Sequence, residues 1–172
     1  MNEMSILMHL LSNKGEYNQI GATKKEILQA LSISPSNKNE SIYFERLITF
    51  LSRYLEPLGL QIKFNPIDDN WFISYENEIS DMISANPFDG KPRLAASLFC
   101  TLVCCLKNSG IGKIHEIQEL RKKKHLLEDL KELEGSGYIE IDDGMMQVRL
   151  TPLIGYQLDL EKLFINLALK LK

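Results

Sequence analysis

The stretch from Arg93 to Pro152 constrains the fold more than any other part of the chain. It begins with an apolar run in which leucine recurs at every fourth position, and two shorter helical patterns follow. Apolar and polar residues then alternate on both sides of Asp142-Asp143-Gly144, which is typical of a β-hairpin. We expect helices at 94–107, 113–120 and 125–133, and strands at 138–141 and 145–150.

Three helices followed by a hairpin are the plan of a winged-helix domain, and the first half of the chain repeats this plan more loosely. Thr23, with Glu26 three residues later, predicts a capping box at the start of the second helix of this half. The sequence therefore predicts an α+β, mostly α fold: two tandem winged-helix domains, each with three helices and a β-hairpin wing, and a C-terminal amphipathic helix. The helices of the first half are expected at 5–11, 24–31 and 40–58, its strands at 60–64 and 71–75, and the C-terminal helix at 159–171.

Two prolines and a glycine between residues 86 and 92 indicate a domain boundary. A short helix is expected just before this boundary, at 76–85. We expect an N-terminal winged-helix domain at 1–86, a linker at 87–92, and a C-terminal winged-helix domain with the terminal helix at 93–172.

The charge balance argues against a protein whose main role is to wrap nucleic acid. The formal net charge of the 172 residues is -3, whereas phosphate binding usually needs a basic surplus. Hydrophobic residues make up 44% of the chain, which is ordinary for a protein with a buried core. The longest apolar run, 94–106, is too short to cross a membrane, and the N-terminus resembles no signal peptide. We expect an intracellular protein with no membrane partner.

No pattern of catalytic, cofactor-binding or metal-binding residues stands out. Cys100, Cys104 and Cys105 share one apolar helical pattern, where core packing is the expected role of a cysteine. A zinc site needs four ligands, and no nearby pair of cysteines or histidines has the spacing to complete one. The histidines are scattered, and the chain has no glycine-rich phosphate loop. We therefore expect no enzymatic activity, no cofactor and no metal.

The dense basic run Arg121, Lys122, Lys123 and Lys124 lies where a DNA-binding winged helix would enter its recognition helix. These side chains are candidates for a weak, non-specific DNA contact through phosphates, and a solvated turn is the alternative. The following helix is rich in carboxylates, and both wings carry paired aspartates at their tips, which phosphates would repel. Sequence-specific reading of DNA is therefore poorly supported.

The apolar surface of the helices exceeds what two small cores require, and such a surplus serves domain packing, self-association or a partner. Internal packing alone explains any single helix equally well. The candidate dimer face consists of Ile42, Phe44, Leu47 and Leu51, and the candidate partner-binding residues are Leu98, Leu102, Phe164 and Leu167.

The order of parts resembles ScpB, the non-kleisin accessory subunit of SMC condensin complexes, which belongs to the kleisin-interacting tandem winged-helix group. The likeness covers nearly the whole chain and includes local patterns in both halves. Where that family usually has Tyr-Arg-Gln-Pro after the long helix, this chain has Leu-Lys-Asn-Ser at 106–109, as in a divergent or archaeal-type member. The matching segments are 60–64, 71–75, 79–83, 93–98, 112–117, 126–130 and 137–139.

This resemblance implies a non-enzymatic protein that forms a homodimer through its first winged-helix domain. It further implies binding to a kleisin (ScpA-like) subunit and, through it, to an SMC protein, with a role in chromosome condensation and segregation. A chromosome-associated location in the cytoplasm follows from the same resemblance. The rival interpretation is a winged-helix transcriptional regulator that binds DNA through the basic run and the third helices.

Overall fold

The computed structural model describes residues 3–15, 19–33, 40–76, 88, 90–122, 125–158 and 160. The chain divides into two compact units, Met1–Ser84 (unit 1) and Ala85–Lys172 (unit 2). The linker proposed at 87–92 stays a prediction, and helix α5 begins at Pro92. In the described part of the chain, no helix has the length and apolar character to cross a membrane.

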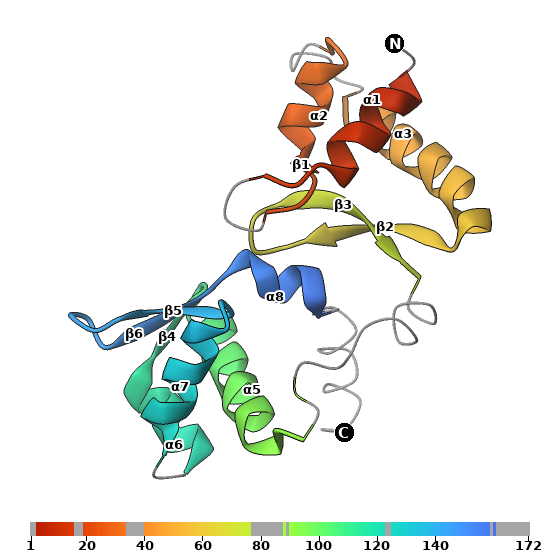
Figure 1. The fold of residues 1–172 in the computed structure, drawn as a ribbon. Helices are drawn as coiled ribbons and strands as arrows, with labels where there is room; N and C mark the ends of the chain where they lie inside the picture. Colours follow the sequence, from red (N-terminus) through yellow and green to blue (C-terminus); the bar gives the residue numbers. More distant parts are fainter. Residues whose placement is uncertain are drawn as a thin grey trace, which may run out of the picture. The chain divides into compact units, whose positions relative to one another are not determined.

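Unit 1 is a winged helix in which a short strand separates the first helix from the second (Figure 1). Its three-stranded antiparallel sheet has the order β1-β3-β2, so the hairpin β2–β3 forms the wing and β1 pairs with its inner strand. The elements are α1 (Glu3–Ser12), β1 (Ala22–Thr23), α2 (Lys24–Ala30), α3 (Glu40–Leu55), the short 3-10 helix η2 (Glu56–Leu58), β2 (Leu60–Asn65) and β3 (Asn70–Tyr75).

Local sequence signals set the ends of these helices. Thr23 caps α2 as predicted, because its hydroxyl accepts from the backbone N–H of Glu26 while the Glu26 carboxylate accepts from the Thr23 backbone N–H at 2.8 Å. These hydrogen bonds lower the pKa of Glu26. Pro57 cannot donate to the α-helical ladder, and Gly59, with a left-handed φ of 68°, ends η2 before β2 begins.

The core of unit 1 lies between the three helices and one face of the sheet. Phe44 contacts Trp71 edge to face, with ring centroids 5.3 Å apart, so the third helix is joined to the wing by two aromatic rings. The residues buried in this core are Leu7, Leu11, Ala22, Ile27, Leu28, Phe44, Leu47, Leu51 and Leu55.

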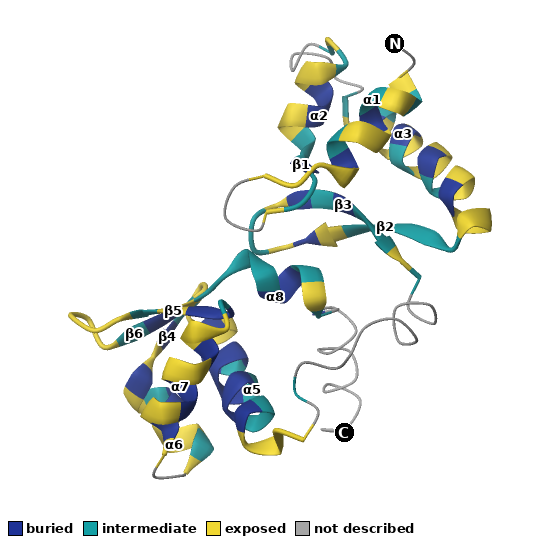
Figure 2. Cartoon of the chain, in the orientation of Figure 1, coloured by how far each residue is buried: buried dark blue, intermediate teal, exposed yellow. Residues whose placement is uncertain are grey.

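Unit 2 has the same topology, with sheet order β4-β6-β5, so both halves of the chain are winged helices as predicted. The apolar helix α5 packs against α6, α7 and the sheet, with half of its 16 residues buried (Figure 2). The elements are α5 (Pro92–Lys107), β4 (Ile111–Lys113), α6 (Ile114–Arg121), α7 (Leu126–Gly135), β5 (Ile139–Asp142), β6 (Gln147–Leu150) and α8 (Pro152–Gln157).

The structure adds elements to the predicted set. The strands β1 and β4, and the short helix α8 after the second wing, have no counterpart in the prediction. The hairpin predicted around Asp142-Asp143-Gly144 is present, and Met146 in its turn adopts a left-handed φ, of 51°. The helices predicted at 76–85 and 159–171 fall almost entirely outside the described residues.

We predict that Gly21→Ala destabilises unit 1 by more than about 1 kcal/mol, because alanine is strained at its positive φ. A Cβ there would also lie 2.0 Å from the carbonyl oxygen of Trp71. Gly15→Ala is the matched control, since its Cβ would meet nothing closer than 3.7 Å, and it should change stability by less than about 0.5 kcal/mol. Urea unfolding followed by the fluorescence of Trp71, the single tryptophan, measures both. Equal midpoints for the two variants would contradict this prediction.

Candidate interaction surfaces

The third helix of a winged helix has an inner side that builds the core and an outer side that meets a partner. On α3 of unit 1 these sides are chemically distinct, and Figure 2 shows buried and exposed residues alternating along the helix. The exposed fractions of Ile42, Phe50 and Tyr54 are 52%, 59% and 67%, and that of Leu58 in η2 is 62%. We call the exposed row at every fourth position the outer ridge: Ile42, Arg46, Phe50, Tyr54 and Leu58.

A second exposed row, Glu45, Thr49 and Arg53, runs beside the outer ridge. Within the described part of the chain, the side chains of Glu45, Arg46 and Arg53 make no ion pair or hydrogen bond. No ion pair or hydrogen bond within these described residues therefore occupies the three charges, and they are available to a partner.

Two open hollows flank Arg53. One, of about 460 Å³, lies between α3 and β2, and the other, of about 510 Å³, lies along the outer side of α3. Small-molecule sites are usually enclosed enough to bury most of their ligand. These hollows are open to solvent and lined by charged and polar side chains as well as apolar ones. They are therefore better suited to contact with a macromolecule than to binding a cofactor.

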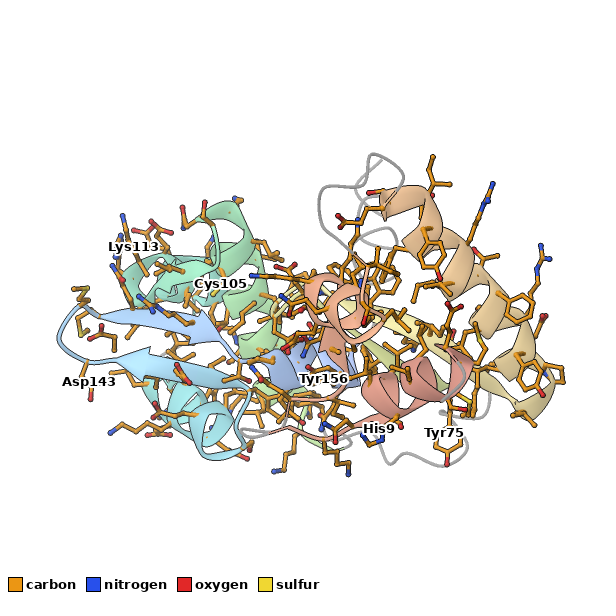
Figure 3. All side chains as sticks on the ribbon, turned by 90° about the horizontal axis from the view of Figure 1, so that it is seen from above. His9, Tyr75, Cys105, Lys113, Asp143 and Tyr156 are labelled. Carbon is orange, nitrogen blue, oxygen red and sulfur yellow. The ribbon has the colours of Figure 1, made fainter. Side chains whose placement is uncertain are left out.

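The equivalent helix of unit 2, α7, has a different outer side. Its exposed residues include Leu127, Lys131 and the three carboxylates Glu128, Glu132 and Glu134. The wing that follows has Asp143 at its exposed tip (Figure 3). A duplex phosphate placed against α7 and this wing would meet mostly negative charge, which disfavours DNA on this side of unit 2.

A buried polar network joins the three helices of unit 2. The Ser97 hydroxyl on α5 donates to the Asp129 carboxylate on α7 at 2.6 Å, and Arg121 Nε on α6 donates to the same hydroxyl at 3.1 Å. Arg93 Nε lies 2.8 Å from Asp129 Oδ1, although that oxygen accepts no aligned hydrogen bond. The Asp129 side chain is only 3% exposed, so the two arginines compensate a carboxylate withdrawn from water.

This network changes the interpretation of the basic run. Arg121 is half-buried, and its guanidinium also donates to the Arg93 carbonyl oxygen at 3.4 Å. Lys122 is exposed and ends α6 with a left-handed φ of 53°. Lys123 and Lys124 lie outside the described residues. A DNA contact through this run stays a prediction, and Arg121 already has a structural role within unit 2.

The structure places the predicted apolar sites mostly inside the units. Of the candidate dimer face, Phe44, Leu47 and Leu51 are buried in the core of unit 1, and only Ile42 is exposed. Of the candidate partner-binding residues, Leu98 and Leu102 are buried in unit 2. The other two, Phe164 and Leu167, lie outside the described residues. The described members of the two sets do not together form an open face, because the apolar side that was singled out on α3 and on α5 is the one that builds the core.

The sequence interpretation missed the exposed aromatic residues Phe50 and Tyr54, and it also missed the buried Asp129. The helical pattern of α3 is apolar on two sides, so apolarity alone does not identify the outer one. One signal in the sequence does identify the outer side. The row of residues at every fourth position that contains Phe50 and Tyr54 also contains Arg46, and a charged residue is rarely part of a core.

The three cysteines pack in the core of unit 2, as expected from their helical pattern. Burial raises the pKa of all three thiols, and it raises that of Cys105 to about 11. The Cys105 thiol donates to the carbonyl oxygen of Val148 at 3.6 Å, which joins α5 to β6. Among the residues that the structure describes, no group of three or more His, Cys, Asp or Glu side chains could hold a metal ion.

We predict that Arg121→Gln lowers the free energy of unfolding of unit 2 by about 1–2 kcal/mol, because it removes a charged donor from the network around Asp129. Lys122→Gln is the matched control, since it removes the same charge from an exposed side chain, and it should change stability by less than about 0.5 kcal/mol. Circular dichroism during urea unfolding measures both changes. Equal effects of the two variants would contradict the structural role of Arg121.

The thiol of Cys105 makes the free energy of unfolding of unit 2 depend on pH in the alkaline range. Its folded pKa of about 11 lies above the ordinary value of 9.0, so its contribution to stability is complete below pH 9.0 and is lost as the pH rises toward 11. We predict that the free energy of unfolding falls more between about pH 8 and about pH 10.5 in the unsubstituted chain than in Cys105→Ala. Parallel pH profiles of the two chains in urea unfolding would show that Cys105 does not contribute.

No protein-family model and no curated protein sequence matches the chain. Among solved structures, it is similar to ScpB from Mycobacterium tuberculosis, with 12% identity and a TM-score of 0.32, over 88% of this chain and 91% of that chain. It is also similar to a chain of the Nse1-Nse3-Nse4 complex, with 15% identity and a TM-score of 0.37, over 90% of this chain and 71% of that chain. At these values the winged-helix assignment rests on the topology of each unit.

Proposed function

We propose that this chain is a non-enzymatic accessory subunit of an SMC–kleisin complex, which binds the kleisin subunit and acts in chromosome condensation and segregation. The observation that carries the proposal is the chemistry of the two third helices. The outer side of α7 is acidic, and the outer side of α3 is apolar and aromatic with two arginines. A tandem winged helix with such surfaces is better suited to protein than to DNA.

The contrast with a DNA-reading protein is electrostatic. Affinity for duplex comes largely from cations that displace counterions from phosphates, and sequence is read by side chains such as Arg, Asn or Gln on base edges. The outer side of α7 has one lysine and three glutamates, and both wings have aspartates near their tips. Arg121, the first residue of the basic run, is held by Ser97 and by the Arg93 carbonyl oxygen. A transcriptional regulator is therefore the weaker candidate.

The outer ridge of α3 has the composition of a protein interface. Tyr, Phe and Arg are enriched at such interfaces, whereas Lys and Glu are depleted at their centres. Phe50 and Tyr54 are among the most exposed large apolar side chains of unit 1, and Arg46 lies in the same row. Aromatic side chains and arginines with this degree of exposure are typical anchors for a partner.

The resemblance of the sequence to ScpB provides the identity of the partner. In this proposal the subunit is a homodimer that pairs through unit 1, and it contacts the SMC protein only through the kleisin. It is cytoplasmic and associated with the chromosome, and any contact with nucleic acid is weak and non-specific.

Titration of the full chain with the kleisin encoded in the same genome tests this function. We expect binding with a Kd of about 1 μM or tighter that is only weakly dependent on salt, because apolar and aromatic contacts would dominate. A scrambled fragment of the same kleisin is the control for non-specific association. Titration with random duplex DNA should give weaker binding that is lost as salt increases. Tight duplex binding that survives high salt, with no binding to kleisin, would favour the regulator and overturn the proposal.

A further inference from the structure

The hairpin of unit 1 has one open side. Its strand β2 lies at the edge of the sheet, and among the described strands it pairs only with β3 (Figure 1). We propose that this edge is a strand-addition site, at which an extended segment of a partner protein, carrying an acidic side chain, pairs with β2 as a further strand. The inference goes beyond the proposed function, because it does not require the partner to be a kleisin.

The register of the hairpin identifies the backbone groups of β2 that face outward. The Glu76 N–H donates to the Gly59 carbonyl oxygen at 3.0 Å, so these two residues form a hydrogen-bonded pair next to the ladder of β2 and β3. Hydrogen-bonded and non-hydrogen-bonded pairs alternate along an antiparallel ladder. The backbone N–H and C=O groups of Leu60, Ile62 and Phe64 therefore point away from β3. Within the described part of the chain, no hydrogen bond involves these outward groups.

The wing of unit 2 has the corresponding edge closed. On β5 the Thr151 N–H donates to the Tyr138 carbonyl oxygen at 3.0 Å, which makes this a hydrogen-bonded pair. Ile139 and Ile141 are therefore the outward-facing residues of that strand. The Ile141 N–H donates to the Glu134 carboxylate of α7 at 2.9 Å. Such a side chain covers an edge that would otherwise pair with another chain, and no described side chain covers the outward groups of β2 in this way.

The hollow of about 460 Å³ lies beside the start of this open edge, between α3 and β2. The side chains of Leu60 and Ile62 pack against the core, so they point to the side of the sheet that faces the helices. Residues directly opposite each other on paired strands point to the same side. Alternate residues of an added strand would therefore face α3 and the hollow. Domains that bind peptides by strand addition use this arrangement, in which main-chain hydrogen bonds give affinity and side-chain pockets give specificity.

The lining of the hollow indicates the chemistry of the added segment. Ile48 and Leu60 provide apolar surface. Arg53 is exposed, and within the described residues its side chain makes no ion pair or hydrogen bond. A carboxylate on the added strand would pair with its guanidinium, which can bind both carboxylate oxygens. Glu56 and Glu76 also line the hollow, so we expect a single acidic side chain with β-branched residues at the neighbouring alternate positions.

A second copy of β2 would be a poor occupant of the same edge. The strand reads Leu-Gln-Ile-Lys-Phe-Asn and has no acidic residue, so it offers no carboxylate to Arg53. Lys63 near its middle also disfavours the pairing of two identical edges, as lysines on edge strands commonly do. The surface is therefore better suited to a segment of a different protein.

Peptides selected from a displayed library of random sequences, with the full chain as the target, test the inference. We expect the selected peptides to have one Asp or Glu between alternating β-branched residues and to bind with a Kd of about 10–100 μM. Bound peptide should slow hydrogen exchange, measured by NMR, by about tenfold or more at the amides of Leu60, Ile62 and Phe64. The amides of Gln61 and Lys63 already pair with β3 and should change less.

Two controls distinguish strand addition from other modes of binding. Methyl groups on the peptide amides that face β2 should abolish binding, whereas methyl groups on the alternate amides should have little effect. Arg53→Glu should weaken the binding of acidic peptides by about tenfold or more, and a selection repeated on this variant should yield peptides with Lys or Arg instead. Arg46→Glu, on the same helix but outside this hollow, is the matched control and should leave binding unchanged.

Protection at other amides, equal effects of the two methylation patterns, or a selection that yields no peptide would overturn the inference. Acidic peptides that bind Arg53→Glu as well as the unsubstituted chain would do the same. Protection of Leu60, Ile62 and Phe64 that rises with the concentration of the chain alone would identify a second copy as the occupant and also overturn it. The kleisin titration separates this result from the proposed function: kleisin binding without protection of these amides would leave that function intact, and peptide binding by a chain that ignores kleisin would do the reverse.

Discussion

The inner side of α3 is the contact on which unit 1 depends. Phe44, Leu47, Leu51 and Leu55 on this side fill the space between the helices and the sheet, and Phe44 continues the contact to Trp71 in the wing. A small winged helix has few other long helices with which to build a core. The orientation of α3 is therefore fixed by folding, and its outer ridge faces solvent as a consequence. The surface available to a partner is thus determined by the requirements of the core.

The two units have the same topology, but different interactions stabilise them. Unit 1 is closed by apolar and aromatic packing, and a capping box begins its second helix. Unit 2 places a carboxylate between its three helices and compensates it with Arg93 and Arg121. A buried charge with oriented partners specifies one arrangement of the helices, because any other arrangement leaves the charge uncompensated.

The order of the elements could be predicted from the sequence, because long helices and hairpins carry clear periodicity. Strands β1 and β4 could not, since two or three residues contain no period and owe their pairing to β3 and β6. The candidate surfaces were less predictable. Whether Phe44 or Phe50 is buried depends on the rotation of α3 against the sheet, and both lie in apolar rows. The burial of Ser97 and Asp129 likewise depends on partners that are distant in sequence.

In unit 2 the methionines lie at the surface of the wing, and the cysteines lie in the core. Met145 and Met146 at the hairpin turn are 66% and 55% exposed, whereas Cys100, Cys104 and Cys105 are buried. Oxidants attack exposed thioethers and ionised thiols, and these thiols are neither exposed nor readily ionised. An oxidant that meets unit 2 therefore converts its two methionines to polar sulfoxides while the core stays reduced. The damage falls on the wing and is of the kind that methionine sulfoxide reductases reverse.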